Sequence, residues 1–230
     1  MRRTLRRLKW LLAAPVLLLL AYQMWVFGHL LWWTRFDPSE TRFMSLRLSE
    51  LRERRPDAQL HWQWVPYERI SINLKRAVVA AEDDGFVDHE GFDWDGIQRA
   101  MEKNRKKGHA VAGGSTISQQ LAKNLFLSPS RSYVRKAQEA AITFMMEAVM
   151  DKRRILEIYL NVVEWGDGVF GAEAAAQRYY RTSAARLGPE QAARLAVMLP
   201  NPRKYEKQFG PRLQAHASRV AARMHYSQVP

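Results

Sequence analysis

The stretch "GGSTISQQLAKNLFL" (residues 113–127) opens with two glycines and a Ser-Thr pair and then continues at helical spacing. Thr116 and Gln119 have the spacing of a capping box, which predicts that a helix begins just after Thr116. A helix that only packed against a core would not need several long polar side chains within six positions, and we expect this one to present a polar face to a substrate. The polar positions are Gln119, Gln120, Lys123 and Asn124.

Outward from this stretch, apolar residues recur at helical spacing along most of the chain, which predicts a mainly α fold. The segment "NVVEWGDGVFG" (161–171) is typical of a glycine-rich turn, and "LPNPRKY" (199–205) of a break between helices. The alternating segment "QLHWQWVPY" (59–67) predicts a strand or a small jaw-like lobe. Further helices are expected near residues 73–83, 95–106, 134–150, 152–160, 171–180, 189–198 and 211–225.

Composition limits the possible chemistry. The 230 residues suffice for one domain and an appendage. The absence of cysteine excludes disulfides and thiolate chemistry, and six scattered histidines make a histidine-based metal site improbable. The formal net charge of +13 indicates an anionic partner, such as nucleic acid, acidic lipid or a phosphorylated substrate.

The N-terminal sequence narrows the choice among these anionic partners. Residues 1–9 form a basic tail, and residues 10–33 are uncharged, apolar and flanked by tryptophans. This run is long enough to span a bilayer and lacks the cleavage site of a signal peptide. The positive cluster predicts an N-terminus in the cytoplasm, a single membrane crossing, and everything after Thr34 outside the cytoplasm. A membrane-anchored domain outside the cytoplasm seldom meets nucleic acid, so nucleic acid is not expected as a partner.

Two regions follow this transmembrane helix. Residues 34–66 are interpreted as a juxtamembrane connecting region, and residues 67–230 as the main folded domain. Trp62 and Trp64 suit either packing against the domain or contact with the membrane surface.

Acidic residues with unusual neighbours are the catalytic candidates. Glu82 and Asp83 lie where a predicted helix ends, and the negative end of a helix dipole raises the pKa of a carboxyl group there. Glu139 lies one helical turn after Arg135 and Lys136. Any one of these carboxylates alone is more commonly a solvated surface charge. Together with the polar-faced helix they indicate a catalytic site.

At these residues the chain resembles the peptidoglycan glycosyltransferases, whose lysozyme-like domain occurs alone or within bifunctional penicillin-binding proteins. All five family motifs appear in order. The chain ends at residue 230 without room for a transpeptidase domain, so the monofunctional form is expected. The resemblance implies a single-pass protein of the bacterial inner membrane, with residues 67–230 as the catalytic glycosyltransferase domain in the periplasm. The matching segments are "EDDGFVDHEGFD" (82–93), "GGSTISQQLAKNLFL" (113–127), "RKAQEAAITFMME" (135–147), "RRILEIYLNVVEWGDGVFGAEAAAQRYY" (153–180) and "RLAVMLPNP" (194–202).

The resemblance implies that Glu82 is the general base and Glu139 the second essential acid. It implies polymerisation of lipid II into β-1,4-linked glycan strands, with inversion and release of undecaprenyl pyrophosphate. His89 suits either a structural role or direct substrate contact. The implied substrate-binding residues are Asp83, Phe86, His89, Ser115, Thr116, Gln120, Lys123, Asn124, Arg135 and Lys136.

The residue types fit this chemistry. A sugar hydroxyl needs a base, whereas a departing pyrophosphate needs neutralisation of its charge by Lys, Arg or a divalent cation such as Mg or Mn. No cofactor is expected to be obligatory. The expected partners are lipid II, the growing strand, membrane lipid and other cell-wall synthesis proteins. Two alternatives are a lysozyme-like enzyme that cleaves glycan and a non-catalytic membrane-anchored partner of a cell-wall complex.

Overall fold

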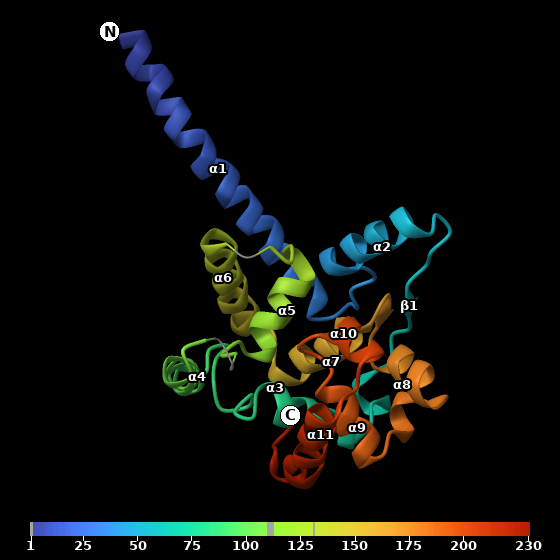
Figure 1. Ribbon diagram of the computed structural model, residues 1–230. Helices are drawn as coiled ribbons and strands as arrows, with labels where there is room; N and C mark the ends of the chain where they lie inside the picture. Colours follow the sequence, from blue (N-terminus) through green and yellow to red (C-terminus); the bar gives the residue numbers. More distant parts are fainter. Residues whose placement is uncertain (1, 110–112, 131) are drawn as a thin grey trace.

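A long helix, α1 (Arg2–Trp33), projects from a compact body of shorter helices (Figure 1). This computed structural model describes residues 2–109, 113–130 and 132–230, with side chains from Ala13 onward. Within α1, Ala13–Trp33 is long and apolar enough to cross a membrane. The basic side chains of the predicted 1–9 tail lie outside the described residues, as does part of the basic loop before Gly113.

The body is mainly α-helical, as the sequence predicts. Its long helices begin and end within a few residues of the expected positions. They are α3 (Ile72–Glu82), α4 (Trp94–Lys107), α5 (Ile117–Phe126), α6 (Tyr133–Val149), α7 (Lys152–Val162), α8 (Ala172–Tyr180), α9 (Pro189–Ala196) and α11 (Pro211–Arg223), with 3₁₀ turns η1 (Tyr67–Arg69), η2 (Ala184–Arg186) and η3 (Met224–Tyr226).

Two helices were not expected from the sequence. The region 34–66 contains α2 (Arg42–Arg54), which begins where the Thr41 hydroxyl accepts a hydrogen bond from the Met44 amide at 3.1 Å. This region is therefore more than a connection, because α2 packs on α5 and buries Met44. The expected break at 199–205 contains the short α10 (Pro202–Lys207). Proline is compatible with the first turn of a helix, so Pro202 starts this element.

A small sheet replaces the predicted glycine-rich turn. Its strands are β1 (His61–Trp62), β2 (Glu164–Gly166) and β3 (Val169–Phe170), in the order β1-β3-β2, with β1 parallel and β2 antiparallel to β3. Trp62 donates its indole hydrogen to the Asn161 carbonyl at 2.9 Å, and Trp64 packs against the core. Both tryptophans therefore pack onto the body.

At the centre of the body, the C-terminus of α3 lies beside α5. Helix α3 packs against α9 and α11, and α5 packs against α6 and α7. Leu74, Val78, Leu121, Ile142 and Tyr159 are fully buried between these helices. Burial of apolar surface on this scale fixes the C-terminus of α3 beside α5.

The C-terminal part of α1 belongs to the body. Val26 and Leu30 are fully buried, and the side-chain amides of Gln23 and Gln138 bind each other at 3.0 and 3.2 Å. Arg154 of α7 donates to the carbonyl of Trp33 at 2.8 Å. The helix that is long enough to span a membrane is therefore docked on α6.

Candidate active site

Glu82 is the last residue of α3 and lies partly buried beside α5. Gln120 of α5 donates a hydrogen bond from Nε2 to Glu82 Oε2 at 2.7 Å. Burial raises the pKa of the Glu82 carboxyl group, because it removes water from the ionised form, and the neighbouring Asp83 acts in the same direction. The Gln120 hydrogen bond and the charge of Lys123 lower the pKa in part. A carboxylate with a raised pKa is a stronger base.

Tyr159 controls the orientation of the Gln120 amide. Its hydroxyl donates to Gln120 Oε1 at 2.9 Å, which leaves the amide nitrogen facing Glu82. Burial raises the pKa of the Tyr159 hydroxyl well above its usual value, and the charges of Glu82 and Asp83 raise it further. The hydroxyl therefore keeps its proton and remains a donor. Tyr159 was not among the site residues predicted from the sequence. The signal that could have identified it is its hydroxyl, a polar group on the buried face of α7.

The loop after Glu82 is fixed to the start of α5. Asp83 accepts from the Ile117 amide and from His89 Nε2, each at 2.9 Å. His89 Nδ1 accepts from the Gly91 amide at 3.1 Å, so Nε2 is the nitrogen that carries the proton. The Thr116 hydroxyl donates to the Gly91 carbonyl at 2.7 Å. These bonds hold Glu82 and α5 in a fixed relation.

The sequence-predicted residues therefore divide into two groups. Asp83, His89 and Thr116 stabilise the loop through the bonds just described, which favours the structural interpretation of His89. Phe86 is fully buried beneath the Lys152 ammonium, 4.8 Å from the ring centre. The ring of Phe86 packs in the core, and its predicted substrate contact stays a prediction.

The second group is a cluster of cations around Glu139 of α6. Glu139 is buried, and its two carboxylate oxygens accept hydrogen bonds from Arg135 and Lys136. Lys136 Nζ also donates to the Ser115 hydroxyl at 3.3 Å, which connects this cluster to the residue before the α5 cap. The Arg135 Nε atom is buried without a hydrogen-bond partner. Glu139 thus holds two cations whose charges exceed its own.

Lys123 lies between the two glutamates. Burial lowers the pKa of the Lys123 ammonium, Glu139 and Glu82 raise it, and Arg135 and Lys136 lower it. No hydrogen bond or ion pair to Lys123 Nζ is present among the described residues. Asn124, the next residue, is largely buried. A partly buried ammonium without a partner is available to an anionic ligand.

A cleft of about 620 Å³ opens beside Glu82, which lines it. Its walls come from the loop after α3, the start of α4 and the glycines before α5, and Arg223 of α11 also lines it. Phe92 and Trp94 stack there with ring centres 5.5 Å apart. Glu82 therefore lines a cleft large enough for sugar rings and also feels the charge of Lys123.

This arrangement is a helical site in which a partly buried carboxylate with a raised pKa lies close to a group of cations. The family model described as "Transglycosylase" matches residues 49–225, and the chain belongs to that family. The family membership and the mainly α fold predicted from the motifs are thereby confirmed.

Full-length relatives agree with this assignment. A biosynthetic peptidoglycan transglycosylase of Aromatoleum aromaticum is 67% identical over 230 residues, which are all of both chains. The protein of the same name from Azoarcus sp. is 69% identical over 96% of this chain and 97% of its own. The one from Dechloromonas aromatica is 62% identical over 98% of each. The enzyme class predicted from the sequence, a peptidoglycan glycosyltransferase, is confirmed.

Proposed function

We propose that this enzyme polymerises lipid II into β-1,4-linked glycan strands and releases undecaprenyl pyrophosphate. The observation that carries the proposal is that Glu82 lines the 620 Å³ cleft and feels the charge of Lys123, which in turn neighbours Arg135 and Lys136. A base that lines a cleft of aromatic and polar side chains, with positive charge nearby, suits attack by a sugar hydroxyl on a sugar pyrophosphate.

The residues have separate tasks in this reaction. Glu82 takes the proton of the acceptor 4-hydroxyl as its oxygen forms the bond to the donor's anomeric carbon. The bond from that carbon to the pyrophosphate oxygen breaks, and the electron pair leaves with the pyrophosphate. Lys123 and the Arg135–Lys136 pair neutralise the developing negative charge. A single displacement converts an α-linked pyrophosphate into a β-glycosidic bond.

Glu139 acts through the cations that it holds. Because both of its oxygens accept hydrogen bonds from cations, it is not placed to donate a proton to a leaving sugar, as a lysozyme-like acid must. Its role in this proposal is to fix Arg135 and Lys136 against the pyrophosphate. This distinction favours glycosyl transfer over glycan cleavage.

The binding of a divalent cation would depend mainly on oxygen atoms of the substrate. No group of three or more Asp, Glu or His side chains suited to a metal is present in the part of the chain that the structure describes. The oxygens of Glu139 are already occupied by Arg135 and Lys136. Mg or Mn would therefore bind chiefly to the pyrophosphate oxygens, and it would add charge neutralisation to that of the three cations.

The lipid part of the substrate would lie near the end of the body where α1 is docked. Helix α1 would cross the inner membrane with the basic tail in the cytoplasm and the body in the periplasm. Large apolar side chains near its docked end are exposed, among them Trp32 and Phe36. Protease added to spheroplasts should digest the body, whereas complete protection in intact spheroplasts would reverse this topology.

One incubation tests the reaction. The full chain in detergent is mixed with labelled lipid II, and the product is analysed before and after lysozyme digestion. A polymer that lysozyme cleaves to disaccharide units supports the proposal. Release of small oligosaccharides from added glycan without lipid II would indicate a hydrolase, and no conversion of either substrate would indicate a non-catalytic partner.

A further inference from the structure

Helix α11 carries a stripe of basic residues along one side. Arg212, His216, Arg219 and Arg223 follow one another at intervals of four, three and four residues, which places them on one helical face. The apolar residues Ala217 and Val220 occupy a different face and are buried. The three arginines are exposed. We call Arg212, His216, Arg219 and Arg223 the α11 stripe.

The positive charge of the α11 stripe is not neutralised along most of its length. Arg223 alone has an acidic neighbour, Asp84, at 3.7 Å. Among the described residues, no ion pair involves Arg212 or Arg219. Burial lowers the pKa of the His216 imidazole, and the charges of Arg219 and Arg223 lower it further. Like charges one turn apart destabilise a helix slightly, so an unpaired stripe suits an external anion.

One end of the α11 stripe enters the cleft. Arg223 lines the cleft beside Glu82, and it donates a hydrogen bond to the Ala80 carbonyl in the last turn of α3. From Arg223 the stripe runs back along α11 to Arg212. Eleven residues of helix span about 16 Å. The exposed arginines of the stripe therefore extend along α11 from the edge of the cleft, with His216, whose pKa is lowered, between Arg212 and Arg219.

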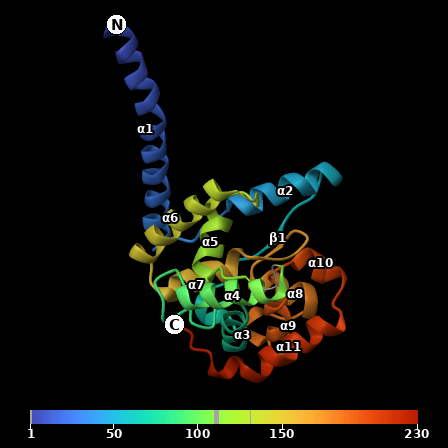
Figure 2. The ribbon, with the colours of Figure 1, turned by 60° about the vertical axis from the view of Figure 1, so that its left-hand side comes forward.

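The place of α11 in the molecule argues against a lipid partner. Figures 1 and 2 both show α11 at the end of the body opposite the free end of α1. If α1 spans the membrane, the stripe faces away from the bilayer. Anionic lipid headgroups would then be out of its reach, and an anionic chain that leaves the cleft would not.

We propose that the α11 stripe guides the glycan strand away from the cleft by binding the carboxylates of its stem peptides. This inference rests on the proposed function, since it takes the strand as the product or the bound substrate. Each disaccharide of lipid II carries a pentapeptide with at least a terminal carboxylate, so the strand presents negative charge at regular intervals. Arginine binds carboxylates through paired hydrogen bonds, which suits exposed residues such as Arg212 and Arg219.

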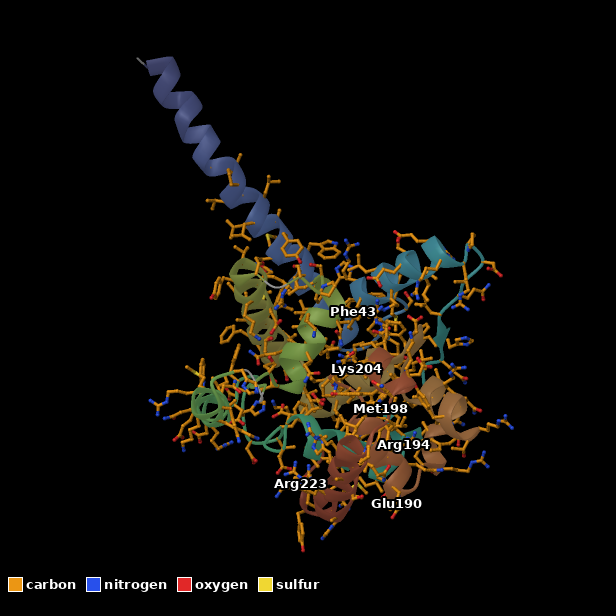
Figure 3. All side chains as sticks on the ribbon, in the orientation of Figure 1. Phe43, Glu190, Arg194, Met198, Lys204 and Arg223 are labelled. Atoms are coloured by element: carbon orange, nitrogen blue, oxygen red, sulfur yellow. The ribbon has the colours of Figure 1, made fainter. Side chains whose placement is uncertain are left out.

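The test variant is Arg212→Gln/Arg219→Gln in the full chain in detergent. Neither residue lines the cleft, and Arg223 is left unchanged because it does. Lys204→Gln/Lys207→Gln on α10 is the matched control, since it removes the same charge from another exposed helix. Figure 3 labels Lys204 and Arg223, which project from these two separate helices.

Two ligands are compared. One is a preparation of soluble uncross-linked glycan strands with stem peptides, and the other is the same preparation after an amidase has removed the peptides. Binding is measured by sedimentation at low and high salt. We expect the α11 variant to bind intact strands about 2- to 30-fold more weakly, as two exposed ionic contacts allow, and the α10 variant to match wild type. Raised salt should reduce this difference.

Three outcomes would overturn the inference. One is equal binding of intact and peptide-free strands by the wild type. Another is unchanged strand binding by the α11 variant. The third is loss of binding to vesicles with anionic phospholipid by the α11 variant while strand binding persists, which would assign the stripe to a membrane. Initial lipid II consumption is measured in parallel. A wild-type chain that never polymerises lipid II would contradict the proposed function, whereas the three outcomes above contradict only the role of the stripe.

Discussion

Lys123 is the residue whose removal should affect catalysis most selectively. Its ammonium lies between Glu82 and Glu139 without a bonding partner among the described residues, so the fold does not depend on it. We predict that Lys123→Ala lowers lipid II turnover by about 10²–10³, the usual effect of losing one preorganised electrostatic partner. Circular dichroism and the melting temperature should stay near those of the wild type. Near-normal turnover in a folded variant would remove Lys123 from the mechanism.

The hydrogen bonds from Tyr159 through Gln120 should appear in the pH dependence. Glu82 acts as a base only when ionised, and the Gln120 hydrogen bond lowers its pKa. Tyr159→Phe frees the amide to turn its oxygen toward Glu82, which would raise that pKa. We therefore predict that the acid limb of kcat/KM against pH moves to higher pH in Tyr159→Phe and in Gln120→Leu.

Tyr180→Phe is the control for this measurement, because the Tyr180 hydroxyl donates a long hydrogen bond of 3.5 Å to the Gln191 carbonyl, away from Glu82. Its pH profile should match that of the wild type. A lower plateau with an unmoved acid limb in Tyr159→Phe would mean that the hydroxyl supports packing and does not tune Glu82.

At the scale of elements, α2 is attached to the sheet by a buried ion pair. Arg47 Nε lies 2.7 Å from Glu164 Oε1, and both side chains are less than a tenth exposed. Arg47→Met leaves Glu164 buried without its partner, which typically costs about 3–5 kcal/mol. We predict a marked fall in the melting temperature, and a smaller fall for Arg47→Met/Glu164→Met, which buries no unpaired charge.

The pH dependence of this destabilisation has a definite sign. Burial raises the pKa of the Glu164 carboxyl group, and Arg47 opposes that effect. Without Arg47 the carboxyl group should take up a proton more readily, so the loss of stability in Arg47→Met should diminish as the pH falls. Equal melting temperatures of the wild type and Arg47→Met at neutral pH would contradict the account of α2.

These elements also show what the sequence could predict. The helices of the body were predicted because their apolar spacing and caps are local, as at Thr116 and Gln119. Helix α2 was missed, because its charged surface hides the few apolar positions, such as Met44, that pack. The pair of Arg47 and Glu164 is 117 residues apart in sequence and leaves no local signal. The sequence placed Gln120 on the polar face of its helix. The hydrogen bond that it accepts from Tyr159 could not be predicted, because the two residues are far apart in the sequence.

At the scale of the whole molecule, α1 has two parts with different roles. Its last turns bury Val26 and Leu30 and bind α6 through Gln23 and Gln138, and its earlier turns project beyond the body. We predict that deletion of residues 1–33 leaves a folded chain with a lower melting temperature and weaker polymerisation in detergent. Deletion of residues 1–21 should preserve the melting temperature, because the docked part remains. Equal melting temperatures of both deletions would show that the docked turns contribute no stability.

The central claim is that Glu82 is the base and Glu139 positions the cations. Its most direct test compares Glu82→Gln and Glu139→Gln for lipid II turnover and for binding of undecaprenyl pyrophosphate, which contains the leaving group but no acceptor. The account predicts that Glu82→Gln loses about 10²–10⁴ in turnover and binds the pyrophosphate normally, whereas Glu139→Gln loses both. Polymerisation by Glu82→Gln at the wild-type rate, or unchanged pyrophosphate binding by Glu139→Gln, would contradict it.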